Sequence, residues 1–161
     1  MKYYVIILST LLILFNQASA QCEVQTNQRE DGVTVRYLRP ERVGYTDQLM
    51  LALSMQTNGS DFFVVALSIF QTEAIKLKGN LTLKFNNNKS VTLQHYRSEI
   101  TTFNGLPATM SIFNVGKNAL ANISTSNIHT AMLQLSNNVF QVVNVKMNSN
   151  ILKTHYNCLK D

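Results

Sequence analysis

The sequence predicts a mainly β domain, either an antiparallel β-sandwich or an open barrel of about eight strands, with a short C-terminal helix. Three observations predict it. Apolar and polar residues alternate along most of the chain after residue 20, which is the pattern of half-buried strands. Turn-forming residues recur at the intervals typical of a sandwich or barrel. The last apolar residues, from Ile151 to Leu159, instead follow helical spacing.

The first twenty residues are predicted to be a signal peptide. Lys2 is followed by an apolar run from Tyr3 to Phe15, and Ala18-Ser19-Ala20 is a cleavage site of the A-x-A type. The run is too short to span a bilayer comfortably, so an uncleaved anchor is the less favoured alternative. We therefore expect residues 21–161 to form one secreted or periplasmic domain that does not insert into a membrane after signal cleavage.

The two cysteines lie near the two ends of this domain. Cys22 and Cys158 allow one intramolecular pairing, and export permits a disulfide. Because the bridge would close nearly the whole domain into a loop, the chain-entropy model gives it about 4–5 kcal/mol. The alternative is a pair of unpaired or intermolecular thiols. The lack of a C-x-x-C pair argues against a redox enzyme.

The N-terminal half predicts strands joined by tight turns. Residues 33–37 alternate until Pro40, which ends the strand. Alternate apolar residues in 49–55 predict a second strand, with these side chains facing the core. Asn58-Gly59 is a strong turn signal, and it leads into residues 62–70, which are apolar on both faces and predict a central strand. Residues 48–71 therefore predict a hairpin.

The remaining segments continue the β pattern. Further strands are predicted at residues 74–77, 81–85, 91–95, 110–115, 128–135 and 139–147, with turns at residues 86–88 and at Asn137-Asn138. Residues 99–107 predict a loop, and residues 119–123 a short helix or turn. A shift of the apolar face between Val142 and Val143 indicates a bulge. Ser149 is the predicted N-cap of the terminal helix, which would bring Cys158 back to the N-terminal segment.

The layout resembles that of small uncharacterised secreted proteins of Bacteroidota. The features that carry the resemblance are the signal peptide, QCEV at residues 21–24, R-P-E-R-V-G at residues 39–44, paired hairpins, G-x-L-x-L-K-F at residues 79–85 and the terminal Cys-Leu. The resemblance covers most of the mature chain and implies export by the general secretion pathway. It implies no activity and no site residues.

The charge of the mature chain is a mild positive excess. Without Lys2, thirteen basic and nine acidic residues give a net charge of +4. The basic residues do not gather as in a nucleic-acid-binding protein, so we expect no nucleic-acid partner. One local group of basic residues consists of Arg36, Arg39 and Arg42. We interpret it as the solvated end of a strand, and the alternative is a small partner-binding cluster.

No catalytic or metal site is predicted. The three histidines, His95, His129 and His155, lack metal-ligand spacing, and His95 is expected to be a packed core or edge residue. His155 could pack beside the disulfide. Glu30 and Asp31 precede Gly32 and predict a turn. Since no nucleophile elbow, P-loop or carboxylate pair is present either, we expect a protein that is not an enzyme and has no cofactor.

The favoured function is therefore binding. We expect a monomeric exported β-domain that binds a protein or glycan partner or supports an envelope structure, with residues 45–48, 99–107 and 116–127 as candidate loops. One alternative is a carrier of a small apolar ligand in a barrel lumen. Another is an enzyme with a site assembled from distant residues. Four sequons, which are glycosylation signals only in a eukaryotic source, occur at Asn58, Asn80, Asn88 and Asn122.

Overall fold

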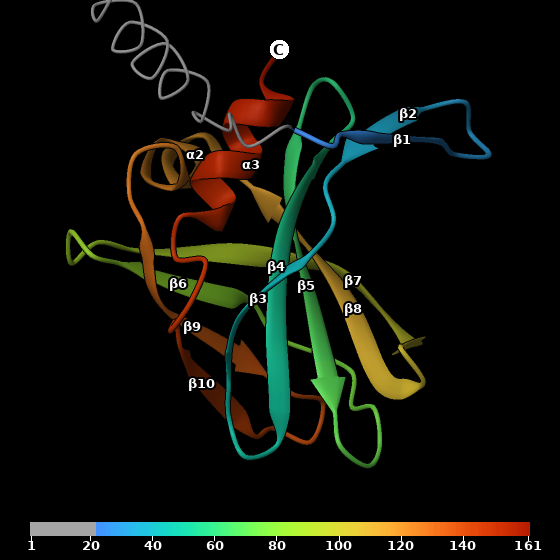
Figure 1. The fold of residues 1–161 in the computed structure, drawn as a ribbon, viewed down its shortest axis with the longest axis vertical. Coiled ribbons are helices and arrows are strands. Elements are labelled where there is room, and N and C mark those ends of the chain that lie inside the picture. The colour runs from blue at the N-terminus through green and yellow to red at the C-terminus, as the bar shows by residue number, and fades with distance from the viewer. Residues whose placement is uncertain (1–21) are drawn as a thin grey trace, which may run out of the picture.

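The computed structural model describes residues 22–161, and the predicted signal peptide lies outside these residues. These residues form ten antiparallel strands and two helices (Figure 1). The predicted β class and short C-terminal helix are confirmed. The strands are β1 (Gln25–Gln28), β2 (Thr34–Tyr37), β3 (Glu41–Tyr45), β4 (Leu49–Thr57), β5 (Phe62–Phe70), β6 (Leu81–Phe85), β7 (Ser90–Phe103), β8 (Leu106–Val115), β9 (Ile128–Gln134) and β10 (Phe140–Asn144), and the helices are α2 (Lys117–Ile123) and α3 (Ile151–Leu159).

The central element is the hairpin of β4 and β5. The two strands pair without interruption from Leu49 with Phe70 to Thr57 with Phe62. The turn lies at the predicted position but comprises the four residues 58–61, since Thr57 pairs with Phe62. Gly59 has a φ of +92°, and the Asn58 side chain accepts a hydrogen bond from the Asp61 N–H. The other edge of β5 pairs with β8, which confirms that β5 is central.

All ten strands belong to one sheet, which bends at β7. The first residues of this long strand pair with β6, and the residues from Gln94 onward pair with β8. The bend divides the sheet into a first arm of β1–β5 and β8 and a second arm of β6, β9 and β10. In Figure 1 the strands of the second arm cross those of the first. One apolar core includes Leu53 and Phe113 of the first arm together with Leu83 and Val143 of the second, so the arms face each other.

The two ends of the curled sheet meet at a seam between β3 and β10. The Val43 carbonyl accepts backbone hydrogen bonds from Lys146 at 2.9 Å and Met147 at 3.3 Å. Gly44 is required here, because a Cβ at this position would lie 2.5 Å from the Asn144 carbonyl oxygen. The two strands form no continuous ladder, so the sheet is not closed.

The helices cover one end of the curled sheet. Ile151, Leu152 and Leu159 of α3 and Ile123 of α2 belong to the main core. Cys22 and Cys158 form the predicted disulfide, with 5.6 Å between their Cα atoms, and it ties α3 to the segment before β1. Among residues 22–161, no helix has the length and apolarity needed to cross a membrane.

Two strands of the first arm are absent from the prediction of about eight. β1, with sequence QTNQ, is a polar edge strand and lacks the apolar alternation that identifies a strand. β3 contains a register shift between Arg42 and Gly44, which breaks its alternation. Residues 74–77, predicted as a strand, instead contribute one isolated bridge from Leu77 to Leu135.

Three local predictions are wrong. Residues 99–107 form a hairpin rather than a loop, because Asn104 and Gly105, with φ of 50° and 79°, make a tight turn between β7 and β8. β10 pairs with β9 in unbroken register, so the bulge predicted at Val142 is absent. Helix α3 is capped by Asn150 instead of Ser149, whose carbonyl still accepts a hydrogen bond from the Ile128 N–H.

Candidate functional site

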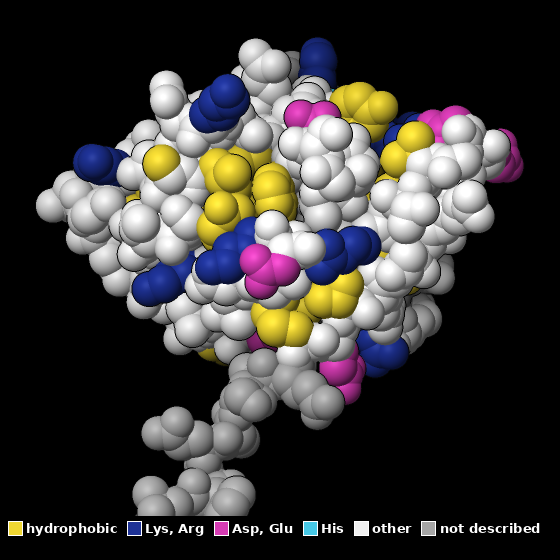
Figure 2. All heavy atoms as spheres, turned by 90° about the horizontal axis from the view of Figure 1, so that it is seen from above, with side chains coloured by type: hydrophobic (Ala, Val, Ile, Leu, Met, Phe, Trp, Pro, Cys, Tyr) yellow, Lys and Arg dark blue, Asp and Glu magenta, His cyan; other side chains and the backbone are white. Residues whose placement is uncertain are grey.

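Charged side chains are dispersed over the surface. Figure 2 shows Lys and Arg side chains interspersed with acidic and uncharged polar ones on the face seen from above. The predicted cluster of arginines is divided by the fold. Arg36 lies in β2 opposite Thr57, exposed Arg39 lies between β2 and β3, and Arg42 lies in β3 opposite Ala52. The three do not line a common pocket.

The outer face of β4, β5 and β8 carries a second apolar cluster. It consists of Ala52, Leu67, Ile69 and Ala108, with Met50 and Met110 packed against it. These residues alternate with those of the main core, because β5 is apolar on both faces. No residue of α2 or α3 belongs to this cluster. The outer face is therefore apolar in the part of the sheet where neither helix covers it.

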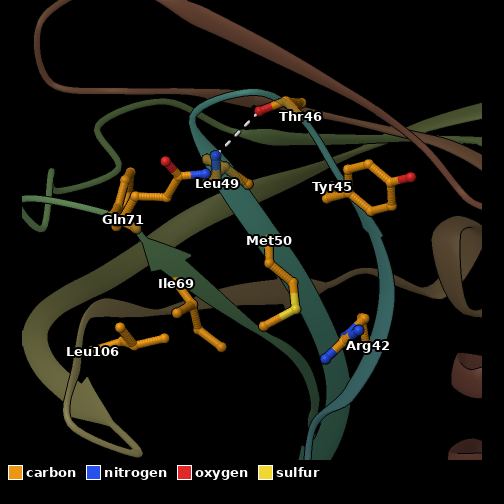
Figure 3. Close-up of a pocket in the computed structure, with 9 residues that line it drawn as sticks. Arg42, Tyr45, Thr46, Leu49, Met50, Ile69, Gln71 and Leu106 are labelled. Carbon is orange, nitrogen blue, oxygen red and sulfur yellow. Dashed lines mark hydrogen bonds between the residues drawn. The ribbon is translucent and has the colours of Figure 1, made fainter.

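The first pocket lies at one end of this cluster and has a volume of about 450 Å³ (Figure 3). A bulge at Val43 shapes one wall of this pocket. Arg42 lies opposite Ala52 and Tyr45 lies opposite Met50. Arg42 and Tyr45 are three positions apart, so they would point to opposite faces of a regular strand, and the bulge places them on the same face. The Thr46 hydroxyl accepts a hydrogen bond from the Leu49 N–H and fixes the turn that follows. The lining residues are Arg42, Tyr45, Thr46, Leu49, Met50, Ile69, Phe70, Gln71 and Leu106.

The second pocket lies at the other end and has a volume of about 470 Å³. A bulge in β7 shapes its wall, because the register shift between His95 and Arg97 leaves Tyr96 as the additional residue. The Tyr96 ring lies 6.1 Å from the Phe63 ring. The lining residues are Asn27, Arg29, Val35, Tyr37, Leu38, Pro40, Ser54, Gln56, Asn58, Phe63, Val65, Tyr96, Arg97, Met110, Ile112 and Asn114.

The apolar cluster links the two pockets. Met50 lines the first pocket and Met110 the second, and both pack against the cluster. Ala52 and Leu67 of the cluster, 5% and 6% exposed, form the strip between the two pockets. We call the two pockets and this strip the outer groove. Methionine side chains are flexible and polarizable, so they can adapt to the shape of an apolar ligand.

The electrostatics of the outer groove are one-sided. Its charged lining residues are Arg29, Arg42 and Arg97, and none is acidic. Arg29 pairs with Asp31 at 2.9 Å and Arg97 with Glu99 at 3.4 Å, and all four of these side chains are about half exposed. Within residues 22–161, Arg42 forms no ion pair. The groove thus combines an apolar floor with one arginine, Arg42, that no carboxylate of residues 22–161 pairs with.

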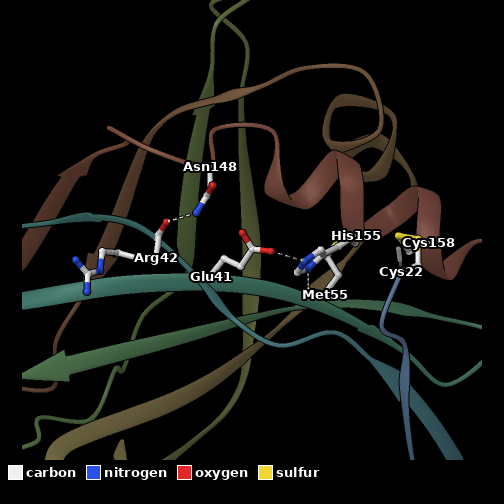
Figure 4. Close-up of polar contacts among 7 residues, drawn as sticks. All are labelled: Cys22, Glu41, Arg42, Met55, Asn148, His155 and Cys158. Atoms are coloured by element: carbon white, nitrogen blue, oxygen red, sulfur yellow. Dashed lines mark hydrogen bonds and ion pairs between the residues drawn. A yellow bond between two sulfur atoms is a disulfide. The ribbon is translucent and has the colours of Figure 1, made fainter. Parts of the chain in front are cut away.

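His155 lies in α3 against the edge of β4 rather than beside the disulfide (Figure 4). Its Nδ1 accepts a hydrogen bond from the Met55 N–H at 3.3 Å. The neighbour of β4 changes from β3 to β2 at this point. The Leu38 N–H donates to the Met55 carbonyl at 3.2 Å, and His155 supplies the acceptor for the Met55 N–H. Nε2 lies 3.9 Å from Glu41 Oε1. Burial lowers the pKa of His155 to about 4, so the ring is neutral and structural at pH 7.

The other histidines lie outside the groove. His95 Nε2 lies 2.7 Å from Ser98 Oγ, and the His95 ring contacts Phe113 edge-on, as expected for a packed edge histidine. Burial lowers the pKa of His95. His129 is exposed and contacts the adjacent Thr130 hydroxyl. Within residues 22–161, no three His, Cys, Asp or Glu side chains form a group that could hold a metal ion.

The predicted binding loops contribute unequally. Tyr45 and Thr46 of the first loop and Leu106 of the second line the first pocket, although Leu106 belongs to β8. Residues 116–127 contain α2 and line neither pocket. Asp31 pairs with Arg29, and its Oδ1 also accepts a hydrogen bond from the Val33 N–H, so it stabilises the predicted turn.

The comparisons with known proteins give no family. No protein-family model, no curated protein and no solved structure matches this chain. The geometry of the outer groove is therefore the basis for the function proposed below.

Sequence reasoning missed this groove. A signal was present in residues 62–70, whose two apolar faces predict a strand covered on both sides. The prediction identified the central strand but not the lack of a helix over its outer face. The two bulges gave no local signal, because a bulge depends on how a strand pairs with its neighbour.

Proposed function

We propose that this protein is a non-enzymatic binding domain that works outside the cytoplasm, and that the outer groove binds an elongated, mainly apolar small molecule. The observation that carries the proposal is that the apolar outer cluster reaches from one pocket to the other, with Ile69 lining the first pocket, Met110 lining the second, and Ala52 and Leu67 between them. Ligand pockets are typically concave and apolar with a few polar groups, and the outer groove has this composition.

The dimensions of the groove support an elongated ligand. Met50 and Gln56 lie at opposite ends of the groove on β4, which at about 3.4 Å per residue places them about 20 Å apart. The packing of the sheet supports this location, because side chains of the main core fill the space between the two arms. We therefore assign the apolar ligand to the outer face of the sheet instead of a barrel lumen. The disulfide supports a location outside the cytoplasm.

Methionine methyl groups offer a direct test. The experiment follows ¹³C-methyl methionine signals while the mature protein is titrated with decanol, a neutral apolar probe. We expect saturable shifts at Met50 and Met110 of the groove. Three methionines are internal controls, since Met55 lies in the main core and Met132 and Met147 are exposed elsewhere.

Each other result would count against the proposal. Equal shifts at Met132 and Met147 would show general adsorption to apolar surface. A shift at Met55 without shifts at Met50 and Met110 would place the ligand in the interior, and no shift at any methionine would remove the binding function.

A further inference from the structure

Arg42 differs from the other two arginines of the outer groove. Arg29 and Arg97 already contact carboxylates, so an anion that binds them competes with Asp31 or Glu99. Arg42 is exposed and has no acidic partner within residues 22–161. Among the described residues, it is also the sole charged one that lines the first pocket. An anion that binds Arg42 therefore displaces no existing partner.

The fold fixes the position of Arg42. Its carbonyl accepts a hydrogen bond from the Asn148 side chain at 2.9 Å (Figure 4), and its pairing partner is Ala52 of the groove floor. In Figure 3 the guanidinium points toward Met50, across the apolar side of the pocket. This arrangement places one cation at the end of an apolar surface.

We propose that the ligand of the outer groove is a long-chain carboxylate, with its carboxylate on Arg42 and its apolar chain over Ala52 and Leu67 toward Met110. This assignment rests on the proposed binding function and specifies its ligand. A guanidinium presents a planar fork of N–H donors that matches a carboxylate. The apolar floor then accounts for the remainder of the ligand.

An extended peptide fits this surface less well. The groove floor is a sheet face, and the backbone groups of β5 are already paired with β4 on one edge and β8 on the other. A peptide strand normally binds at a free sheet edge, where its own N–H and C=O groups find partners. A peptide laid across the floor would leave many of these groups unpaired, whereas an acyl chain has none.

The test compares decanoate with decanol, which share a chain length and differ in charge. Dissociation constants are measured by the methionine methyl shifts for the unmodified protein, for Arg42→Gln, and for the control Arg39→Gln, an exposed arginine outside both pockets. We expect the unmodified protein to prefer decanoate. Arg42→Gln should lose about tenfold in decanoate affinity, the effect of one charge-assisted hydrogen bond, and keep its decanol affinity. Arg39→Gln should retain both affinities.

The outcomes separate this assignment from the proposed function. Equal affinity of the unmodified protein for decanoate and decanol would overturn the carboxylate assignment and leave apolar binding in place. A loss of decanoate affinity in Arg97→Gln but not in Arg42→Gln would overturn the assigned orientation. Failure of both probes to shift Met50 and Met110 would instead refute the proposed function.

Discussion

The two faces of the β4–β5 hairpin are both apolar, yet they lie in different surroundings. On the inner face, Leu53 and Val64 are 0% exposed beneath the second arm and the helices. On the outer face, Leu67 is 6% and Ile69 4% exposed, and the residues beside them belong to the same sheet and to the groove walls. The comparison teaches that nearly equal burial can come from a second layer or from neighbouring side chains. We expect the residues buried by a second layer to control stability and the residues buried by neighbouring side chains of the same sheet to control binding.

Truncation of one leucine on each face is the most direct test of this difference between the inner and outer residues. Leu53→Ala should lower the free energy of unfolding by about 4 kcal/mol, because the closely packed core cannot collapse around the cavity. Leu67→Ala should cost about 2 kcal/mol, since the open groove can relax, and should weaken decanol binding. Urea denaturation of both variants measures the difference. Equal losses of stability would mean that the outer row is as structural as the inner one.

The dependence of stability on pH tests how α3, which covers the inner face, contributes to the fold through His155. Its folded pKa of about 4 lies below the unfolded value of 6.5, so the unfolded chain binds more protons between these pH values. Stability contributed by the neutral ring is present above pH 6.5 and is lost as the pH falls toward 4. The loss is about 3 kcal/mol.

Paired variants separate this effect from the titration of carboxylates. The amide of His155→Asn retains an oxygen that can accept from the Met55 N–H, and this variant should lose that part of the pH dependence. His129→Asn, which changes an exposed histidine, should keep it. Unfolding measured at pH 4, 5.5 and 7 compares the three proteins, and parallel curves would contradict the assignment.

The smallest effect concerns a polar defect on the inner face. Ser68 is 0% exposed, and its hydroxyl has no hydrogen-bond partner within residues 22–161. Ser68→Ala should therefore raise the free energy of unfolding by about 1 kcal/mol. Thr109→Val is the matched control, because the Thr109 hydroxyl donates to the Ile75 carbonyl, and its loss should cost about 1 kcal/mol. A destabilised Ser68→Ala would show that the hydroxyl has a function that its contacts do not reveal.

Several features could be predicted from the sequence because their signals are local. The hairpin of β4 and β5 follows from alternation and from Asn58-Gly59, because Gly59 adopts the positive φ that the turn requires. Helix α3 follows from its 3.6-residue periodicity. The Cys22–Cys158 bridge follows from counting, since two cysteines allow one intramolecular pairing.

The candidate site could not be predicted in this way. Arg36, Arg39 and Arg42 are neighbours in sequence, but only Arg42 lines a pocket. Tyr45 and Leu106 are far apart in sequence and line the same pocket, because the sheet places the β3 and β8 ends on one face. The sequence does not indicate that the three arginines are separated or that Tyr45 and Leu106 lie close together, since both depend on the order of the strands in the sheet.

The β class, the central hairpin, the terminal helix and the disulfide can all be predicted from the amino-acid sequence, because alternation and turn residues act over short stretches of chain and the cysteines need only be counted. The bend of the sheet at β7, the position of the helices over one end and the absence of α2 and α3 from the outer face of β5 are instead features of the tertiary structure. The bulges at Val43 and Tyr96, which place an arginine and a tyrosine at each end of the groove, also belong to this level. The physical reason is that a side chain's face and neighbours are set by strand register and order, which residues distant in sequence establish together.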